Sequence, residues 1–425
     1  MTTLSVYGLG YVGLPTAALF ANEGFDVCGV DTDPEHLATL RTGGADFRET
    51  ALNEYVDRAL ESGALALRER PTASDYHLVC VPTPYDYDRE EADLSYVRAA
   101  AESIAPRLRR GDAVVVESTV PPGTTAGLVR DTLEREGSLP EQEFDLAFCP
   151  ETVLPGSILE ELRHNDRIVG GIDEESTATA LGLFERVIEG DVHTARDATT
   201  AEFVKLAQNT FRDTNIALAN ELAKVARDYD VVPRSAFGLA NEHPRVSLLR
   251  PGPGVGGHCL PVDPLYLGQD SDSIDLIERA RAVNDGMVEC VRDLLADGLG
   301  SLSGKRIAVF GLAYKGNVAD TRNSPSKRLL ELLVESRPML AADGGALPAE
   351  VRVHDPHVTD ASVDLFDRTS ALDGADALVF MTGHDEFESL SPETVAERMR
   401  GDFVVDAKGL TDERWREAGL VVEHL

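Results

Sequence analysis

The chain has 425 residues, enough for two or three domains, and its composition is that of an ordinary globular protein. Its 74 acidic and 40 basic residues give a formal net charge of −34, which argues against nucleic-acid binding because phosphate backbones would be repelled. No apolar run is long enough to cross a bilayer, and no signal sequence is visible before the first strand pattern. We therefore expect a cytoplasmic protein with no membrane partner.

The acidic residues are spread along the whole chain, lysine is rare, and arginine supplies most of the positive charge. This imbalance favours a halophilic protein, adapted to a salt-rich cytoplasm where screening weakens self-repulsion, over a merely acidic one. The five cysteines are scattered and show neither a disulfide framework nor zinc spacing. We expect no bound metal.

Short apolar runs alternate with amphipathic helical patterns in the first part of the chain. We expect strands at residues 4–7, 27–30, 78–81, 113–117 and 146–148, and helices at residues 14–22 and 34–41. An alternation of strands and helices predicts a parallel, doubly wound sheet.

Residues 199–229 contain neither glycine nor proline, and their apolar residues recur at helical spacing, so one helix of about 30 residues is expected. A second alternation follows, with strands expected at residues 306–310, 351–354, 377–380 and 403–405 and a surface loop at 337–348. The sequence thus predicts an α/β protein with two Rossmann-like, doubly wound parallel-sheet domains joined by a long central helix. We place the three segments at residues 1–197, 198–300 and 301–425.

A glycine motif follows the first strand and opens a helix, which is the context of a dinucleotide-binding GxGxxG. Asp31 ends the next strand, where a carboxylate can bind the ribose hydroxyls of NAD and would repel the 2′-phosphate of NADP. NAD is therefore the expected cofactor. Its expected contacts are the motif residues Gly8, Gly10, Tyr11, Val12 and Gly13, then Asp31, and the strand-end residues Pro82, Thr83 and Thr119.

Three further patterns carry reactive side chains. Glu151 follows a strand, where it can reach a ligand, although a solvent-facing loop glutamate would have the same context. Lys205 and Asn209 share one face of the long helix, and Lys205 can be a catalytic cation or can extend to solvent. Cys259 directly follows a glycine-rich loop, with Asp263 four residues further on, and a thiolate there can act as a nucleophile.

Together these patterns resemble the UDP-glucose/GDP-mannose dehydrogenase family over essentially the whole chain. The blocks at residues 153–156, 165–171 and 240–259 look like the UDP-N-acetyl-D-mannosamine dehydrogenase branch. The resemblance implies an N-terminal NAD-binding domain, a homodimer formed by the central helix, and a C-terminal domain that binds a UDP-sugar. It also implies four-electron oxidation of the sugar C6 alcohol to a uronic acid.

The resemblance assigns roles to individual residues. Cys259 would be the nucleophile that forms a thiohemiacetal and then a thioester, Lys205 and Asn209 would stabilise oxyanions, and Asp263 would support the thiol. Thr119 and Glu151 would direct water in the hydrolysis step. Arg322 would contact the cofactor across the cleft. The implied substrate contacts are Glu151, Leu154, Lys205, Asn209, Gly256, Gly257, Lys315, Lys408 and, with a possible origin in the partner subunit, Arg245.

The chain departs from the family pattern at three positions. Pro155 and Lys408 replace a glutamate and an arginine of glucose-type members, which points away from UDP-glucose, and Thr152 replaces an arginine common in the branch. Dehydrogenases of UDP-N-acetylglucosamine, UDP-glucose or GDP-mannose are the enzymatic alternatives. The alternative from another class is an NAD-sensing scaffold, which would need none of the reactive residues together.

Overall fold

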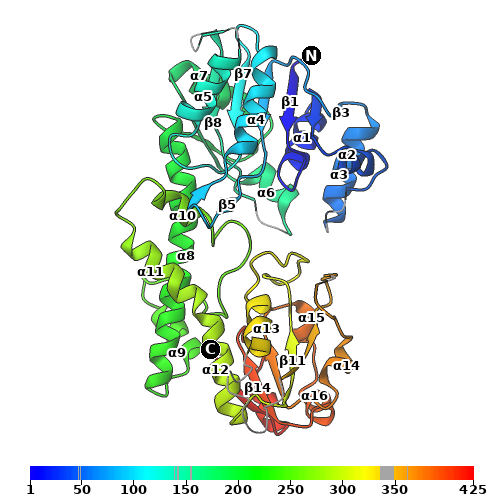
Figure 1. Ribbon diagram of the computed structural model, residues 1–425, viewed down its shortest axis with the longest axis vertical. Coiled ribbons are helices and arrows are strands. Elements are labelled where there is room, and N and C mark those ends of the chain that lie inside the picture. Colours follow the sequence, from blue (N-terminus) through cyan, green and yellow to red (C-terminus); the bar gives the residue numbers. More distant parts are fainter. Residues whose placement is uncertain are drawn as a thin grey trace. The chain divides into compact units, whose positions relative to one another are not determined.

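The computed structural model describes residues 1–45, 47, 49–137, 139–140, 143–153, 156–335, 349–360 and 362–425. The chain divides into two compact units, Met1–Gln208 with Leu265–Ser271, and Asn209–Pro264 with Asp272–Leu425. Each unit has a central sheet with helices packed on it (Figure 1). The surface loop expected at 337–348 lies outside the described residues.

The first unit holds an eight-stranded sheet whose order is β10-β9-β8-β7-β4-β1-β2-β3. Neighbouring strands are parallel from β8 to β3, as predicted, but β9 runs antiparallel to β8, and β10 is parallel to β9. The chain therefore reverses direction at one side of the sheet. The strands are β1 (Thr3–Tyr7), β2 (Asp26–Val30), β3 (Leu65–Arg68), β4 (Tyr76–Val79), β7 (Ala113–Val116), β8 (Asp145–Phe148), β9 (Arg167–Gly171) and β10 (Val192–Thr194).

Alternating side chains of this sheet enter two separate cores, which is what double winding requires. In β7, Val115 joins one core while Val114 and Val116 join the other. The first core is covered by α1 (Gly13–Asn22), α3 (Thr50–Glu61), α6 (Ile158–His164) and α7 (Glu174–Phe184). The second is covered by α4 (Ser95–Ile104), η2 (Thr125–Val129), α5 (Arg130–Glu136) and the start of α8 (Ala198–Asp228).

The second unit holds a five-stranded parallel sheet in the order β12-β11-β13-β14-β15. Val309 faces one core and its neighbours Ala308 and Phe310 face the other, so this sheet is also covered on both sides. Its strands are β11 (Arg306–Phe310), β12 (Glu350–His354), β13 (Ala377–Phe380), β14 (Phe403–Asp406) and β15 (Val421–His424). Its covering helices are α12 (Met287–Leu299) and α13 (Pro325–Glu335) on one face, and α14 (Arg368–Leu372), α15 (Asp385–Glu388), α16 (Pro392–Arg398) and α17 (Glu413–Glu417) on the other.

The long helix predicted at residues 199–229 is confirmed as α8, which has 31 residues and is drawn in green in Figure 1. Its first residues belong to the first unit and the rest to the second. In the second unit it is followed by α9 (Pro233–Ala240) and α11 (Asp275–Asp285), and a buried ion pair joins Asp213 on α8 to Arg281 on α11 at 2.6 Å. Among the described residues, no helix combines the length and hydrophobicity that a bilayer crossing requires.

The glycines between β1 and α1 give the first prediction. A Cβ on Gly13 would lie 1.9 Å from the carbonyl oxygen of Gly8, whereas a Cβ on Gly10 would meet nothing within 4 Å. We expect Gly13→Ala to lower the free energy of unfolding by about 1–3 kcal/mol because the backbone must move apart. Gly10→Ala is the matched control and should keep the wild-type melting temperature. Calorimetry without ligand that found equal melting temperatures would contradict this packing.

Candidate active site

The glycine loop after β1 forms a cradle. Gly8 has a φ of +87°, which favours glycine, and a Cβ there would lie 2.8 Å from the carbonyl oxygen of Cys80. The Leu9 N–H donates to Asp31 Oδ2 at 2.9 Å, so the carboxylate at the end of β2 is held beside the loop. Val12 immediately precedes α1, and the space above Gly10 is open. This arrangement fits a dinucleotide, whose pyrophosphate can approach the backbone at Gly10.

The two loops expected to line the cofactor site contact each other. The Thr83 hydroxyl donates to the carbonyl of Thr119 at 2.7 Å, and the Ser118 hydroxyl donates to the carbonyl of Val81 at 2.6 Å. Val81 also lies beside Gly8, with its Cα 3.0 Å from where a Gly8 Cβ would be. The strand ends that carry Pro82, Thr83 and Thr119 therefore gather next to the glycine loop. Tyr11 is half-exposed in that loop, with its ring 5.9 Å from that of Phe47.

Glu151 and Lys205 lie together in the first unit. Both are buried, with 9% and 7% exposure, and the Lys205 ammonium donates to the carbonyl of Glu151 at 2.7 Å. Its Nζ is also 3.6 Å from Glu151 Oε1. Lys205 therefore does not extend to solvent, and Glu151 is not a solvent-facing loop residue. A buried carboxylate beside a buried ammonium can exchange a proton or orient water.

Glu202, one turn before Lys205, is a residue whose role sequence reasoning missed. Its carboxylate is fully buried and accepts hydrogen bonds from the Gly123 N–H at 2.5 Å and the Thr125 N–H at 2.8 Å. It thereby holds the turn that follows Thr119. Burial raises the pKa of Glu202 to about 7. The available signal was an acidic residue on the same helix face as Lys205.

Cys259, Asp263 and Asn209 form a second constellation, in the second unit. The Asp263 N–H donates to the Cys259 carbonyl at 2.8 Å, so the two residues belong to one turn that leads into α10 (Asp263–Gly268). The Asn209 amide donates to Asp263 Oδ2 at 2.5 Å, and both side chains are buried while Cys259 is exposed. Asp263 therefore fixes the orientation of the Asn209 side chain. The Cys259 thiol remains accessible.

The glycine-rich loop before Cys259 packs against the segment that carries Arg322. The Gly257 N–H donates to the Arg322 carbonyl at 2.9 Å, and a Cβ on Gly256 or Gly257 would come within 3.0 Å of Tyr314. The close approach of Tyr314 therefore requires glycine at both positions. The Arg322 side chain is paired with Asp320 at 2.6 Å, a contact that raises the pKa of Arg322.

Two cations, Lys408 and Arg234, lie at the segment after β14 in the second unit. The Lys408 ammonium lies 3.6 Å from the position of a Gly252 Cβ, and the Arg234 guanidinium donates to the Gly409 carbonyl at 3.1 Å. Burial lowers the pKa of Lys408, and the Arg234 charge lowers it further. Like charges held this close in so acidic a protein point to an anionic ligand. Arg234 was not expected from the sequence, because α9 gives no local signal for it.

Two further substrate candidates lie at the surface. Lys315 and Arg245 are exposed on loops, the first after β11 and the second after α9. Leu154 and Pro155 lie outside the described residues. The Thr152 carbonyl accepts a hydrogen bond from the Asn165 amide at 3.1 Å.

One group among the described residues, His357, His384 and Glu386, has ligand-type atoms within 4.8 Å of one another. Both ring nitrogens of the buried His384 are already engaged: Nδ1 accepts from the Asn317 N–H at 2.9 Å, and Nε2 faces Asp355 Oδ2 at 3.0 Å. The group is therefore explained as a hydrogen-bond network that holds the loops after β11 and β12.

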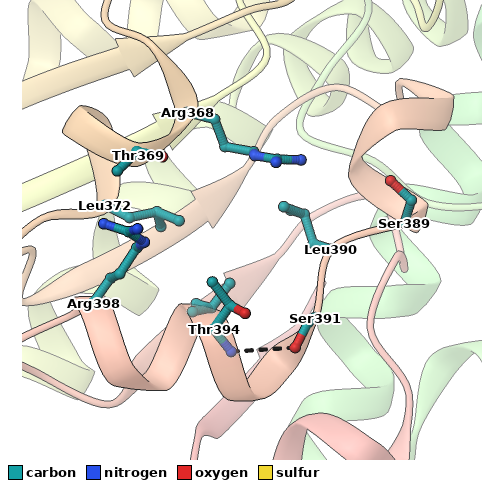
Figure 2. Close-up of a pocket in the computed structure, with 9 residues that line it drawn as sticks. Arg368, Thr369, Leu372, Ser389, Leu390, Ser391, Thr394 and Arg398 are labelled. Atoms are coloured by element: carbon teal, nitrogen blue, oxygen red, sulfur yellow. Dashed lines mark hydrogen bonds between the residues drawn. The ribbon is translucent and has the colours of Figure 1, made fainter.

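A hollow of about 260 Å³ lies between α14 and α16 (Figure 2). None of the residues singled out from the sequence lines it. Its polar groups are largely used locally: Arg398 pairs with Asp373 at 2.8 Å, and the Ser391 hydroxyl donates to Glu393 at 2.6 Å. We assign it no part in the chemistry.

The fold and these constellations define a dehydrogenase with a dinucleotide-binding domain, and comparison with known proteins gives the family. Three models of the UDP-glucose/GDP-mannose dehydrogenase family match the chain: its NAD binding domain at residues 2–188, its central domain at 199–286 and its UDP binding domain at 308–413. The chain belongs to this family and is an NAD-dependent nucleotide-sugar dehydrogenase.

Relatives match along the whole chain. UDP-N-acetyl-D-mannosamine dehydrogenase of Methanococcus aeolicus is 39% identical over 99% of this chain and 94% of its own length. The enzyme of that name from Salmonella typhi is also 39% identical, over 98% of this chain and 99% of its own length. The solved structure of the UDP-D-ManNAc dehydrogenase from Pyrococcus horikoshii has a TM-score of 0.91 and 38% identity, covering 100% of this chain and 99% of that one.

The pH dependence of stability tests the environment of Glu202. Since its pKa rises from 4.5 to about 7 on folding, the folded state disfavours its ionised form. The contribution of Glu202 to the free energy of unfolding is fully present below pH 4.5. It is lost as the pH rises to about 7, a change of roughly 3 kcal/mol. Glu202→Gln cannot titrate, so its free energy of unfolding relative to wild type should increase by that amount between pH 4.5 and 7.5. Urea unfolding of both proteins at each pH measures this difference, and a constant difference would refute the assignment.

Proposed function

We propose that the protein oxidises the C6 alcohol of UDP-N-acetyl-D-mannosamine to UDP-N-acetyl-D-mannosaminuronate, for surface polysaccharide or glycan synthesis. The observation that supports this choice of substrate is the 39% identity, over nearly the whole chain, to relatives named UDP-N-acetyl-D-mannosamine dehydrogenase. We assign NAD binding to residues 1–197, dimerisation to residues 198–300 and UDP-sugar binding to residues 301–425. We also propose a cytoplasmic location, which fits five cysteines that form no disulfide among the described residues.

The cofactor supplies a hydride acceptor, and its proposed contacts are the glycine loop, Asp31, Pro82, Thr83, Thr119 and Arg322. The open space at Gly10 and the placement of Asp31 support this assignment. Both carboxylate oxygens of Asp31 accept backbone N–H groups, from Leu9 and Asp33, which orients the group while leaving lone pairs for ribose hydroxyls. A 2′-phosphate at this place would meet a negative charge.

The proposed chemistry has two oxidations and one hydrolysis. The alcohol loses a hydride to NAD and a proton to a base, which gives the aldehyde. The Cys259 thiolate adds to the aldehyde carbon, and the resulting thiohemiacetal loses a second hydride to a second NAD, which gives a thioester. Water then attacks the thioester carbon, the thiolate leaves, and the carboxylate is released. One water is consumed, and each carboxylate is accompanied by two NADH and three protons.

The residues of the chain have distinct tasks in this sequence. Lys205 and Asn209 would donate to the tetrahedral oxyanions, an effect worth about 3–4 kcal/mol per donor in comparable sites. Asp263 would hold Asn209, as its 2.5 Å hydrogen bond supports. Glu151, with Thr119, would orient the attacking water, which its burial beside Lys205 supports.

The proposed substrate contacts away from the chemistry are mainly cationic. The Lys408 ammonium near Gly252 and the Arg234 guanidinium at Gly409 suit the diphosphate of a UDP-sugar. Lys315, Arg245, Leu154, Gly256 and Gly257 complete the proposed set. UDP-N-acetylglucosamine and UDP-glucose are the alternative substrates.

A substrate panel combined with Cys259 variants tests this proposal. With UDP-N-acetyl-D-mannosamine, we expect release of two NADH per sugar, measured by absorbance, and a kcat/KM at least about tenfold above that for the two alternative sugars. Cys259→Ala should abolish formation of the acid, because no thioester can form. Cys149→Ala is the matched control and should keep most activity. A wild-type protein that binds NAD but does not oxidise UDP-N-acetyl-D-mannosamine would refute the proposed substrate.

We also propose that α8 forms a homodimer. Phe211, Leu218 and Val225 follow one another at intervals of seven residues, so they lie in one stripe along the helix, and they are 69%, 49% and 45% exposed. Such a stripe is typical of a helix that packs against a partner. The shared Arg245 would then come from the neighbouring subunit.

The acidic surface makes this dimer dependent on salt in our proposal. At −34, repulsion between subunits is strong at low ionic strength, whereas in molar salt the Debye length falls to about 3 Å and the charges are screened. We expect sedimentation at 2 M KCl to give a mass near twice 45.9 kDa, with dissociation and a lower melting temperature at 0.1 M. Leu218→Glu should give a monomer in 2 M KCl, and Tyr96→Glu, at another exposed apolar residue, should not. A wild-type monomer at 2 M KCl would refute the dimer, and equal melting temperatures at both concentrations would refute the salt adaptation.

A further inference from the structure

The backbone that carries Glu151 is held by side chains from outside its own strand. β8 ends at Phe148, and the carbonyls of three successive residues beyond it each accept a hydrogen bond from a different side chain. The donors are Arg167 to Pro150 at 2.9 Å, Lys205 to Glu151 at 2.7 Å and Asn165 to Thr152 at 3.1 Å. The Glu151 carboxylate in turn accepts from the Val153 N–H at 2.6 Å. These donors take the place of strand pairing for this segment.

Arg167 reaches this segment because β9 runs against its neighbour. Gly170 of β9 pairs with Phe148 at the end of β8, so Arg167, the first residue of β9, lies at the carboxyl edge of the sheet. In a fully parallel sheet the first residue of each strand would lie at the opposite edge. The direction reversal therefore delivers a guanidinium to the edge where β7 and β8 end.

Glu117 fixes the other side of Arg167. The two side chains are 1% and 0% exposed, and Arg167 Nη1 lies 3.1 Å from Glu117 Oε1. The Cys80 thiol donates to Glu117 Oε2 at 3.1 Å, so the carboxylate is held on both oxygens. Burial raises the pKa of Glu117, and the Arg167 charge opposes that rise. A guanidinium bound to both Glu117 and the Pro150 carbonyl has little freedom to move.

We propose that Arg167 and Glu117 are a positioning pair that sets the place of Glu151 for the hydrolysis step. This inference rests on the proposed role of Glu151 in directing water. The pair acts through the Pro150 peptide. A shift of about 1 Å in a catalytic group can lower a rate by about 100-fold. Such a shift would slow thioester hydrolysis and would leave the two hydride transfers, which do not use Glu151, intact.

The test removes the pair without leaving an unpaired charge. Arg167→Met alone strands the Glu117 carboxylate in the core and destabilises the fold, so the variant of interest is Glu117→Gln/Arg167→Met. Arg167→Lys keeps the charge and one donor for the Pro150 carbonyl. The matched control is Asp112→Asn/Arg109→Met, which removes an ion pair of 3.0 Å elsewhere in the same unit. All proteins are compared by melting temperature, NADH burst, steady-state kinetics and amide hydrogen exchange of residues 149–153.

For Glu117→Gln/Arg167→Met we expect a near-wild-type melting temperature, a full burst of two NADH per subunit, and a kcat about 100-fold lower. KM should fall in parallel, because the steps that form the thioester, and with them kcat/KM, are unchanged. Exchange at residues 149–153 should be faster than in the control, and Arg167→Lys should recover kcat to within about tenfold of wild type. A kcat near wild type, a burst lost together with kcat, or unchanged exchange would each overturn the positioning role. If the wild-type protein reduces no NAD with any UDP-sugar, the proposed function is refuted. The exchange data would still show whether Arg167 and Glu117 hold the segment that carries Glu151.

Discussion

Carbonyl groups at the carboxyl edge of the first sheet have no further strand to pair with, and their need for donors organises the site. The segment after β8 obtains those donors from Arg167, Lys205 and Asn165. Two of the three are cations, so satisfying the backbone also brings positive charge to the place where, in the proposed mechanism, a reacting oxygen becomes negative. In that mechanism the same side chains would meet the structural requirement and the chemical one. This explains how a lysine can stay buried in an apolar part of α8.

In the second unit too, cationic side chains are placed where they can serve a ligand. The protein carries a large excess of negative charge, yet the Arg234 charge, held at Gly409, is felt by Lys408 and lowers its pKa. Keeping like charges together costs free energy in the absence of a ligand, and a bound diphosphate would remove that cost. An acidic surface and a local pair of cations are therefore compatible: the first concerns solubility and self-association, and the second concerns recognition.

Much of the fold could be predicted because it depends on local patterns. Strands such as 306–310 and the helix α2 (Pro34–Arg41) fall where period and capping place them. The antiparallel direction of β9 could not be predicted, since its five residues carry no signal about the strand that they will meet. The partner of Lys205 could not be predicted either. The spacing of Lys205 places it on one helix face but does not identify the Glu151 carbonyl as its acceptor. Glu202, Arg234 and the Glu117–Arg167 pair were missed because their partners are distant in sequence.

The unbroken α8 sets a rule for how this chain can change. Glu202, Lys205 and Asn209 are separated by three and four residues, so their side chains project from one side of the helix, and all three are buried. Each residue added to or removed from a helix rotates everything beyond it by about 100°. A single insertion between Glu202 and Asn209 would therefore turn Asn209 away from Asp263 or Glu202 away from Gly123. Exposed positions such as Phe203 can therefore accept substitutions. Insertions and deletions between Glu202 and Asn209 cannot be accepted without loss of these contacts.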